Sequence, residues 1–148
     1  MTNAELQTLT EQLSLKYFHQ PFRHQVFFNR RLKTTGGRYH LHDHHIDINP
    51  LMLEEVDEDN LKRVILHELC HYHLHLAGRG YQHRDRDFKL LLKQVGGSRY
   101  APATSKARHQ RRYRYLYRCQ RCGVWLPRMR RFNTSRYHCA RCGGRFRL

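Results

Sequence analysis

The pentapeptide His67-Glu68-Leu69-Cys70-His71 limits what this chain can be more than any other feature of its sequence. Two histidines four residues apart project from one face of an α-helix, one turn apart, so both imidazoles can reach the same metal ion. Glu68 lies next to that ion without sharing the histidine face. H-E-x-x-H on a helix is the signature of a zinc hydrolase, usually a peptidase, with the glutamate as general base. The motif therefore predicts a catalytic zinc on His67 and His71, with Glu68 as the catalytic residue.

A buried helix is predicted around this motif. Asp57 or Asp59 can cap a helix that ends near Gly78. Apolar residues fall on most of its circumference, so the helix is expected to be central in the fold; they are Leu61, Val64, Ile65, Leu66, Leu69, Leu74 and Leu76. A central helix must satisfy the polar side chains that it buries. A metal ion can do so for the motif. The alternative is three core side chains that hydrogen-bond to one another, and we prefer the metal site.

The third metal ligand distinguishes among zinc hydrolases. The longer metzincin pattern fails, because Leu74 and Ala77 occupy its glycine and histidine positions. Glutamate as a distant ligand also fits poorly, because none follows Glu68. His83 is the better candidate, since a short glycine-containing loop could return it to the metal. His75 continues the ligand face one turn later and is the weaker alternative.

Charge is distributed unevenly along the chain. Residues 1–87 contain 11 Lys and Arg against 12 Asp and Glu, whereas residues 88–148 contain 17 Lys and Arg and no acidic residue. A block of one sign predicts a polyanionic partner, for which nucleic acid is the first candidate. The alternative is a solvated basic tail. No apolar run resembles a signal peptide or a membrane span, so we expect a cytoplasmic protein without a membrane partner.

The rest of the first part predicts helices and short strands. Leucines and a tyrosine spaced by three and four indicate a helix over residues 4–18 with one apolar stripe, Leu6, Leu9, Leu13 and Tyr17. Another helix is expected from about Asp85 to Val95. The expected strands are residues 26–28, 39–41 and 45–48, and a turn is expected at residues 34–37. Four histidines in this region are interpreted as surface residues that could hold metal adventitiously: His40, His42, His44 and His45.

Four cysteines near the end of the chain predict a second metal site. Cys119-x2-Cys122 and Cys139-x2-Cys142 are separated by 16 residues. Four thiolates in this arrangement form a tetrahedral structural zinc site of the ribbon or knuckle type. So small a module cannot bury enough core alone, so the metal would supply much of its folding free energy. Disulfide pairing is the alternative. Strands are expected at residues 113–118, 124–131 and 145–148.

This cysteine-rich module also carries arginines and aromatic residues. In residues 112–118, strand alternation places three tyrosines on one face and arginines on the other. Arginines can grip phosphates while aromatic rings stack on unpaired bases; the alternative is that the tyrosines form the module's own core. We expect a nucleic acid partner, in the first place single-stranded or partly unpaired DNA. The arginines assigned to it are Arg112, Arg114, Arg118, Arg128, Arg130 and Arg131.

These features together resemble the SprT-like/Spartan family of zinc metallopeptidase domains, in particular its small bacterial members. The resemblance covers nearly the whole chain. It rests on the leading helix and strands that end in Ile46-Asp47-Ile48-Asn49-Pro50, on residues 67–71, on His83 with Phe88 after it, and on the cysteine module. In many relatives an aromatic residue is four positions after the later histidine, whereas Phe88 is five after His83.

The resemblance implies roles for particular residues. His67, His71 and His83 would hold the catalytic zinc and Glu68 would be catalytic, while Cys119, Cys122, Cys139 and Cys142 would hold the structural zinc. The best-known relatives cleave proteins crosslinked to DNA. The expected function is therefore peptide-bond hydrolysis by zinc-bound water that Glu68 activates, directed by the basic module to protein substrates on DNA. In a bacterial cytoplasm, such a protein could associate with the nucleoid.

The expected fold class is α+β. A small zincin-like catalytic domain, made of helices and a short antiparallel sheet, would cover residues 1–97, followed by a basic linker at 98–112 and a C-terminal β zinc ribbon at 113–148. Two alternatives to the peptidase remain. One is a catalytically silent nucleic-acid-binding zinc protein that acts in transcription or DNA maintenance. The other is a metal-dependent hydrolase of a different substrate, such as a nucleic-acid end.

Overall fold

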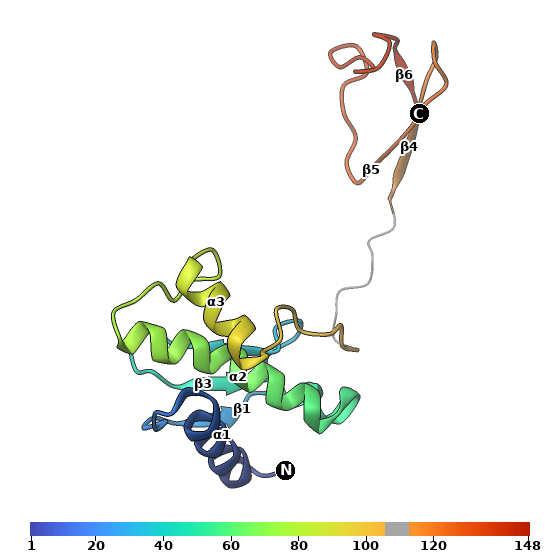
Figure 1. The fold of residues 1–148 in the computed structure, drawn as a ribbon. Coiled ribbons are helices and arrows are strands. Elements are labelled where there is room, and N and C mark those ends of the chain that lie inside the picture. The colour runs from blue at the N-terminus through green and yellow to red at the C-terminus, as the bar shows by residue number, and fades with distance from the viewer. Residues whose placement is uncertain (106–112) are drawn as a thin grey trace. The chain divides into compact units, whose positions relative to one another are not determined.

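In the first part of the chain one helix is followed by three strands and then by further helices, and the regular elements described in the second part are all strands (Figure 1). The computed structural model describes residues 1–105 and 113–148. The chain divides into two units, Met1–Ala107 and Arg108–Leu148, each with its own hydrophobic core. The mixed α+β class predicted from the sequence is confirmed. Among the described residues, no helix is both long and apolar enough to cross a membrane.

Helix α1, Asn3–Phe18, begins with a capping box. The N–H of Glu5 donates to the hydroxyl of Thr2, and the N–H of Thr2 donates to the carboxylate of Glu5, both at 3.1 Å. The helix ends where His19 adopts a left-handed conformation. Tyr17, which the sequence predicts in the apolar stripe, is exposed, because Phe18 is the residue of the last turn that packs against the core. The buried residues are Leu6, Thr10, Leu13 and Ser14.

Three short strands form a mixed sheet in the order β1-β3-β2. They are β1, Val26–Phe28, β2, Gly37–Tyr39, and β3, Ile46–Ile48. The β2 and β3 strands are antiparallel, but β1 and β3 are parallel, so the predicted antiparallel sheet is wrong for that pair. The hairpin after β2 turns the chain back, and β3 then lies between β2 and β1. The β2 strand also starts two residues earlier than predicted. Strands of three residues carry no pattern that identifies their neighbours.

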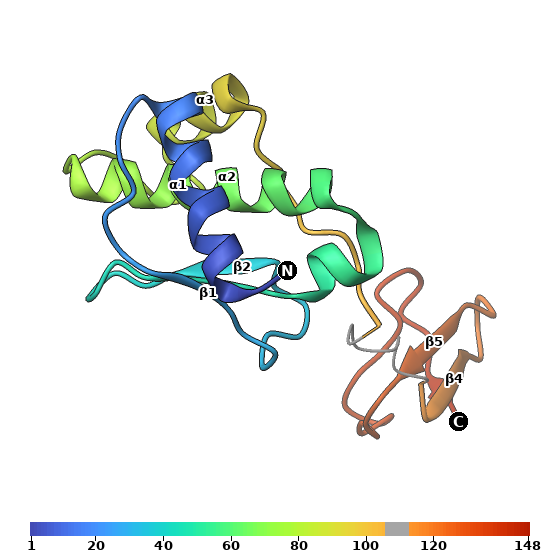
Figure 2. The same ribbon diagram turned by 90° about the horizontal axis from the view of Figure 1, so that it is seen from below.

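Helix α2, Glu58–Leu76, is the centre of the first unit, as predicted. The carboxylate of Asp57 caps it by accepting a hydrogen bond from the N–H of Asn60 at 2.7 Å. A π-helical turn, η1 (Met52–Val56), leads into it, and α3, Arg86–Val95, follows it. In Figure 1 α2 lies between α1 and α3, and Figure 2 shows α1 crossing over α2; α2 contacts both helices. It also contacts β2 and β3, so its side chains reach both the sheet and the loop before α3.

Residues 98–105 belong to the first unit, whereas the sequence predicts a linker that begins at residue 98. The N–H of Ser98 donates to the carbonyl of Arg63 at 3.1 Å, and the hydroxyl of Thr104 donates to the carbonyl of Lys33 at 3.0 Å. Hydrogen bonds of this kind require no apolar periodicity, so the sequence carries no signal for them. The rest of the predicted linker, residues 106–112, lies outside the described residues.

The second unit is a small antiparallel sheet in the order β5-β4-β6. Its strands are β4, Tyr115–Cys119, β5, Trp125–Arg128, and β6, Phe146–Arg147. Each overlaps a predicted strand and is shorter. The core is small and consists of Tyr117, Cys119, Cys139 and Phe146, with Phe132 packed against it.

Candidate metal centres

His67, His71 and His83 converge on one point, and we call them the histidine triad. The first two come from α2 and the third from the loop between α2 and α3. The Nε2 atom of His83 lies 3.0 Å from Nε2 of His67 and 3.0 Å from Nε2 of His71, and the last two atoms are 3.3 Å apart. The three nitrogens could hold a metal ion. The fold thus brings the predicted third ligand to the two motif histidines.

The outer nitrogens of the two helical histidines face backbone carbonyls. Nδ1 of His67 is hydrogen-bonded to the carbonyl of Ser98, and Nδ1 of His71 to the carbonyl of Tyr81. A carbonyl only accepts, so each Nδ1 carries the proton and each Nε2 presents a lone pair to the centre. Burial lowers the pKa of His67 and lowers that of His71 to about 4, which keeps both rings neutral. Neutral rings with inward lone pairs are the form that binds a metal ion.

Carboxylates hold the loop that carries His83. The N–H of Gln82 donates to the carboxylate of Asp85 at 3.0 Å, and the N–H of Gly80 donates to the carboxylate of Asp87 at 3.1 Å. The two acidic residues after the motif therefore organise the third ligand's loop. Neither belongs to the clusters of potential metal ligands found among the described residues.

Phe88 packs against all three rings of the histidine triad. Its ring stacks on His71 at a centroid distance of 4.3 Å and meets His67 and His83 edge-on, at 5.2 Å in each case. The side chain is buried on α3. Phe88 thus places an aromatic ring beside the triad, although it lies five residues after His83 where many relatives have an aromatic residue four positions after.

Glu68 lies in the same cleft as the histidine triad. The cleft has a volume of about 630 Å³ and is also lined by Gly37 of β2 and by residues 98–101. The side chain of Glu68 is buried, and burial raises its pKa to about 8. A Cβ at Gly37 would be 2.9 Å from Cγ and 3.1 Å from Oε1 of Glu68. Glycine therefore leaves the space that the carboxyl group occupies.

The other polar residues of α2 have different partners. The Nε2 atom of His73 is hydrogen-bonded to the hydroxyl of Ser14 at 2.7 Å, on the buried side toward α1. His75, the weaker candidate for the third ligand, is hydrogen-bonded through Nδ1 to the hydroxyl of Tyr39 at 2.7 Å. Cys70 is fully buried in the core, where burial raises its thiol pKa to about 12. None of the three takes part in the histidine triad.

The histidines before β3 are not all surface residues. His42 is exposed, as predicted, whereas His40, His44 and His45 are half-buried. His40 and His45 lie against Asp47, and these three residues form another group that could hold a metal ion. The hairpin folds the two histidines over the sheet, which alternation in the sequence alone does not reveal.

The four cysteines of the second unit form one cluster that could bind a metal ion. All are free thiols, with Sγ of Cys119 3.4 Å from Sγ of Cys142 and Sγ of Cys122 3.7 Å from Sγ of Cys139. This excludes the disulfide alternative in the structure. The N–H of Cys122 donates to Sγ of Cys119 at 3.4 Å and lowers the pKa of that thiol. The arrangement is compatible with a zinc ribbon.

The basic residues of the second unit lie on its surface. Those predicted to bind nucleic acid are exposed where described, namely Arg114, Arg118, Arg128, Arg130 and Arg131; Arg112 lies outside the described residues. Tyr117 is 3% exposed, so the core interpretation applies to it. Trp125, which the sequence reasoning did not single out, is 54% exposed and lies under the guanidinium of Arg118 at 5.0 Å. It is the exposed aromatic ring of the β4–β5 pair, because side chains alternate along a strand.

A model of the SprT-like family matches residues 6–109. The chain belongs to the SprT-like family. Relatives named "Protein SprT-like" match it along almost its whole length. The relative from Lactiplantibacillus plantarum is 60% identical over 148 residues, covering 100% of this chain and 99% of its own, and that from Enterococcus faecalis is 54% identical over 145 residues, covering 98% and 94%. The relative from Bacillus subtilis is 50% identical, covering 99% and 97%. No solved structure matches significantly.

In this SprT-like chain, several residues that shape the sites escaped the sequence reasoning. The carbonyls of Tyr81 and Ser98 orient the histidine triad, and a backbone carbonyl is the same in every residue type. Gly37 was interpreted as part of a turn, although two adjacent glycines after two threonines were a signal for close packing. Asp47 was noticed only as part of the family motif.

Proposed function

We propose that this SprT-like chain is a zinc-dependent metallopeptidase that acts on proteins associated with DNA. One observation carries the proposal: three inward-facing Nε2 atoms meet in a cleft that also contains a buried glutamate. The zincin-like character of the first unit belongs to the same proposal, as do two zinc ions, one on the histidine triad and one on the four cysteines of the second unit.

The spacing of the donor atoms supports zinc. Tetrahedral zinc with Zn–N bonds of about 2.0–2.1 Å separates two ligand nitrogens by roughly 3.3 Å, and Zn–S bonds of about 2.3 Å separate two sulfurs by roughly 3.8 Å. The nitrogens of the histidine triad are 3.0–3.3 Å apart. The paired sulfurs of the cysteine cluster are 3.4 and 3.7 Å apart. Three protein ligands leave an open position in the first site, whereas four close the second, so only the first would be catalytic.

Glu68 would move the protons of the reaction. Zinc, when bound, supplies Lewis acidity to the peptide carbonyl and acidifies water. The carboxylate of Glu68 takes a proton from the attacking water and delivers it to the leaving amine. Burial raises the pKa of Glu68 to about 8 and a nearby cation acts in the opposite direction. Burial keeps His67 and His71 neutral, and their hydrogen bonds to the Ser98 and Tyr81 carbonyls turn the Nε2 lone pair of each ring toward the centre of the triad.

The β2 strand offers a place for an extended substrate. It is an edge strand, since the sheet order is β1-β3-β2, and its residues line the cleft beside Glu68. An extended peptide can add to such an edge through main-chain hydrogen bonds. Main-chain recognition would select an accessible, unfolded segment more than a particular sequence.

The second unit would bring the peptidase to DNA. Its exposed arginines can bind phosphates, and the exposed ring of Trp125 can stack on an unpaired base. The described part of this unit has no acidic side chain to offset the positive charge of these arginines. This surface favours DNA with unpaired bases, and it contains no helix to read a groove.

The decisive experiment compares the zinc-loaded full chain with Glu68→Gln on a DNA-binding protein substrate, with and without DNA. General acid–base catalysis typically contributes about 10²–10⁴-fold, so we expect a loss of at least roughly 100-fold in the variant and faster cleavage when DNA is present. Glu58→Gln is the matched control, because it makes the same change at an exposed position of α2. It should cleave like the wild type.

Two outcomes separate the parts of the proposal. Equal cleavage by the wild type and Glu68→Gln would refute the peptidase role of Glu68. Cleavage that depends on Glu68 but not on DNA would leave the peptidase standing and remove the role of DNA.

A further inference from the structure

Asp47 is a buried carboxylate on the face of the sheet opposite to α2. Its neighbours in β3, Ile46 and Ile48, point into the core, and alternation along the strand sends Asp47 to the other side. His45 shares that face, two residues earlier, and the paired strand β2 brings His40 alongside. Asp47 is only 4% exposed. A buried carboxylate requires a cation or a full set of hydrogen bonds.

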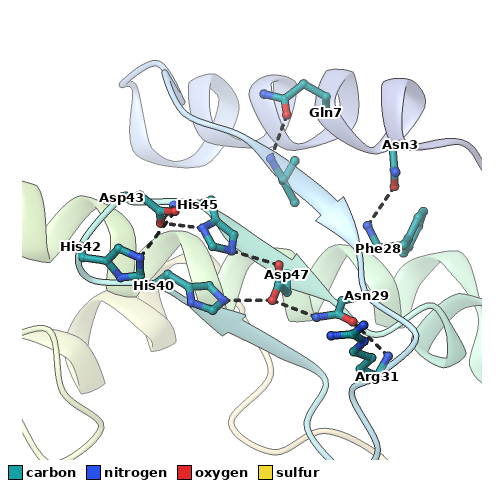
Figure 3. A network of polar contacts seen from close by, with 11 residues as sticks. Asn3, Gln7, Phe28, Asn29, Arg31, His40, His42, Asp43, His45 and Asp47 are labelled. Atoms are coloured by element: carbon teal, nitrogen blue, oxygen red, sulfur yellow. Dashed lines mark hydrogen bonds and ion pairs between the residues drawn. The ribbon is translucent and has the colours of Figure 1, made fainter.

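The hydrogen bonds of Asp47 reach only one of its oxygens, and the dashed line to the other oxygen in Figure 3 marks an ion pair with His45. Oδ2 accepts from Nε2 of His40 at 2.9 Å and from the side-chain amide of Asn29 at 3.2 Å. Oδ1 is buried and accepts no hydrogen bond from the described residues. Nε2 of His45 lies 3.2 Å from Oδ1 but makes no hydrogen bond with it. Oδ1 therefore has His45 within ion-pair distance but has no hydrogen bond from the described residues.

His45 is held in the orientation of a metal ligand. Its Nδ1 lies 2.5 Å from the carboxylate of Asp43, and its ring stacks on Phe27 at a centroid distance of 5.1 Å. With its ring proton on Nδ1, toward Asp43, His45 presents the lone pair of Nε2 to Oδ1 of Asp47. Carboxylate–histidine pairs of this kind orient metal ligands. A lone pair and a carboxylate oxygen repel each other unless a cation lies between them.

We propose that His40, His45 and Asp47 form a third metal site, the hairpin site, for a divalent ion of the Zn²⁺ class. One ligand atom from each lies within 4.8 Å of the others, and two imidazoles with one carboxylate suit zinc. The rings of His40 and His45 stack at 3.8 Å with an interplanar angle of 15°. One ion cannot lie in both ring planes, so His40 rotates on binding and its ring proton moves from Nε2 to Nδ1. Asn29 keeps its bond to Oδ2.

The hairpin site would act on the strand that lines the catalytic cleft. Arg38 of β2 pairs with Asp47 of β3 in the sheet register, and Gly37 precedes it. The carbonyl oxygen of Asp47 is 3.1 Å from the Cβ position of Gly37, which in turn faces Glu68. An ion that bridges His40, on the β2 side of the hairpin, to β3 would therefore hold the edge strand in place. This role is structural and does not depend on peptidase activity.

The test uses the tag-free full chain and Zn²⁺ alone. We expect the wild type to bind three ions, and Asp47→Asn and His45→Gln to bind one fewer each by titration calorimetry and elemental analysis. His42→Gln is the matched control, because its side chain is 80% exposed on the same hairpin; it should bind as the wild type does. Long-range ¹⁵N NMR of the histidine rings should show Nε2 of His45 moving to a metal-bound shift.

Two results would overturn the hairpin site. One is an unchanged number of ions in Asp47→Asn and His45→Gln. The other is a His45 ring that carries protons on both nitrogens in the zinc-saturated wild type, which would show an imidazolium–carboxylate network instead. If Asp47→Asn fails to fold, the number of ions bound by His45→Gln and the ¹⁵N shift of His45 Nε2 in the wild type test the hairpin site. Loss of an ion in His67→Ala concerns the histidine triad and leaves this outcome unaffected.

Discussion

Gly37→Ala tests whether the space beside Glu68 is as tight as the structure indicates. The added methyl group would lie 2.9 Å from Cγ and 3.1 Å from Oε1 of Glu68, and 3.1 Å from the carbonyl oxygen of Asp47. Real Cβ atoms essentially never approach another atom within 3.0 Å, so the Glu68 side chain or the strand must move. The glutamate is buried on a central helix, which leaves it little room to do so.

The expected cost follows from two opposing effects. Overpacking typically costs about 1–3 kcal/mol, whereas replacing glycine by alanine gains about 0.4–1 kcal/mol through the unfolded chain where the backbone permits it. The backbone of Gly37 permits alanine, because its φ is not positive. We therefore expect Gly37→Ala to lower the free energy of unfolding of the first unit by roughly 1–2 kcal/mol.

A double-mutant cycle with Glu68→Ala identifies the source of that cost. Truncating Glu68 removes the two contacts with its side chain and leaves only the Asp47 carbonyl. Residues in contact typically couple by about 0.5–3 kcal/mol, and we expect a coupling of about 1 kcal/mol here, with the alanine better tolerated in the Glu68→Ala background. All four proteins are compared at equal zinc content.

Urea unfolding can follow each unit separately. The described helices all belong to the first unit, so far-UV circular dichroism reports on it. Trp125 is the single tryptophan and belongs to the second unit, so its fluorescence reports on that unit and should not change. Additive costs within about 0.5 kcal/mol would refute the argument that Gly37 makes room for Glu68.

Three further predictions concern the metals, the nucleic acid surface and pH. His67→Ala and Cys119→Ser should each remove one zinc ion by elemental analysis; a variant with wild-type content would contradict that site. Trp125→Ala should weaken binding of single-stranded DNA roughly five- to hundred-fold, since stacking is worth about 1–3 kcal/mol per base. Binding by the wild type should fall steeply with salt. Unchanged affinity in the variant, or salt-insensitive binding by the wild type, would contradict the proposed DNA-binding surface of the second unit. Burial lowers the pKa of His73 from 6.5 to about 4, so the unfolded chain binds protons more readily. The urea midpoint of the metal-free protein should therefore fall as pH decreases from about 6.5 to about 4. The midpoint of His73→Gln should fall less steeply with pH. An equal pH dependence in the two proteins would show that His73 does not contribute.

Local patterns predicted the helices well. The position of α2, its cap at Asp57 and its central burial all follow from residues close together in the sequence, because helix geometry relates each residue to those three and four positions away. The spacing of the cysteines likewise predicted their clustering, since paired ligands on short turns have few ways to meet.

Nonlocal arrangements were not predictable in this way. The parallel pairing of β1 with β3 involves three-residue strands, and sequences this short do not indicate which strand they pair with. Residues 98–105 join the rest of the first unit through hydrogen bonds that leave no pattern in the sequence. His40 and His45 were interpreted as surface residues, yet the hairpin folds them onto Asp47.

The sequence by itself determined the donors of the histidine triad and the cysteine cluster. A metal site depends on which side chains carry lone pairs and on how far apart a helix or turn holds them, and both properties are local. Only the tertiary structure decided what surrounds those donors: the carbonyls that turn their lone pairs inward, the glycine that leaves room for Glu68, and the strand that brings Asp47 to two histidines. These contacts join residues far apart in the chain, and they form only when the core around α2 packs.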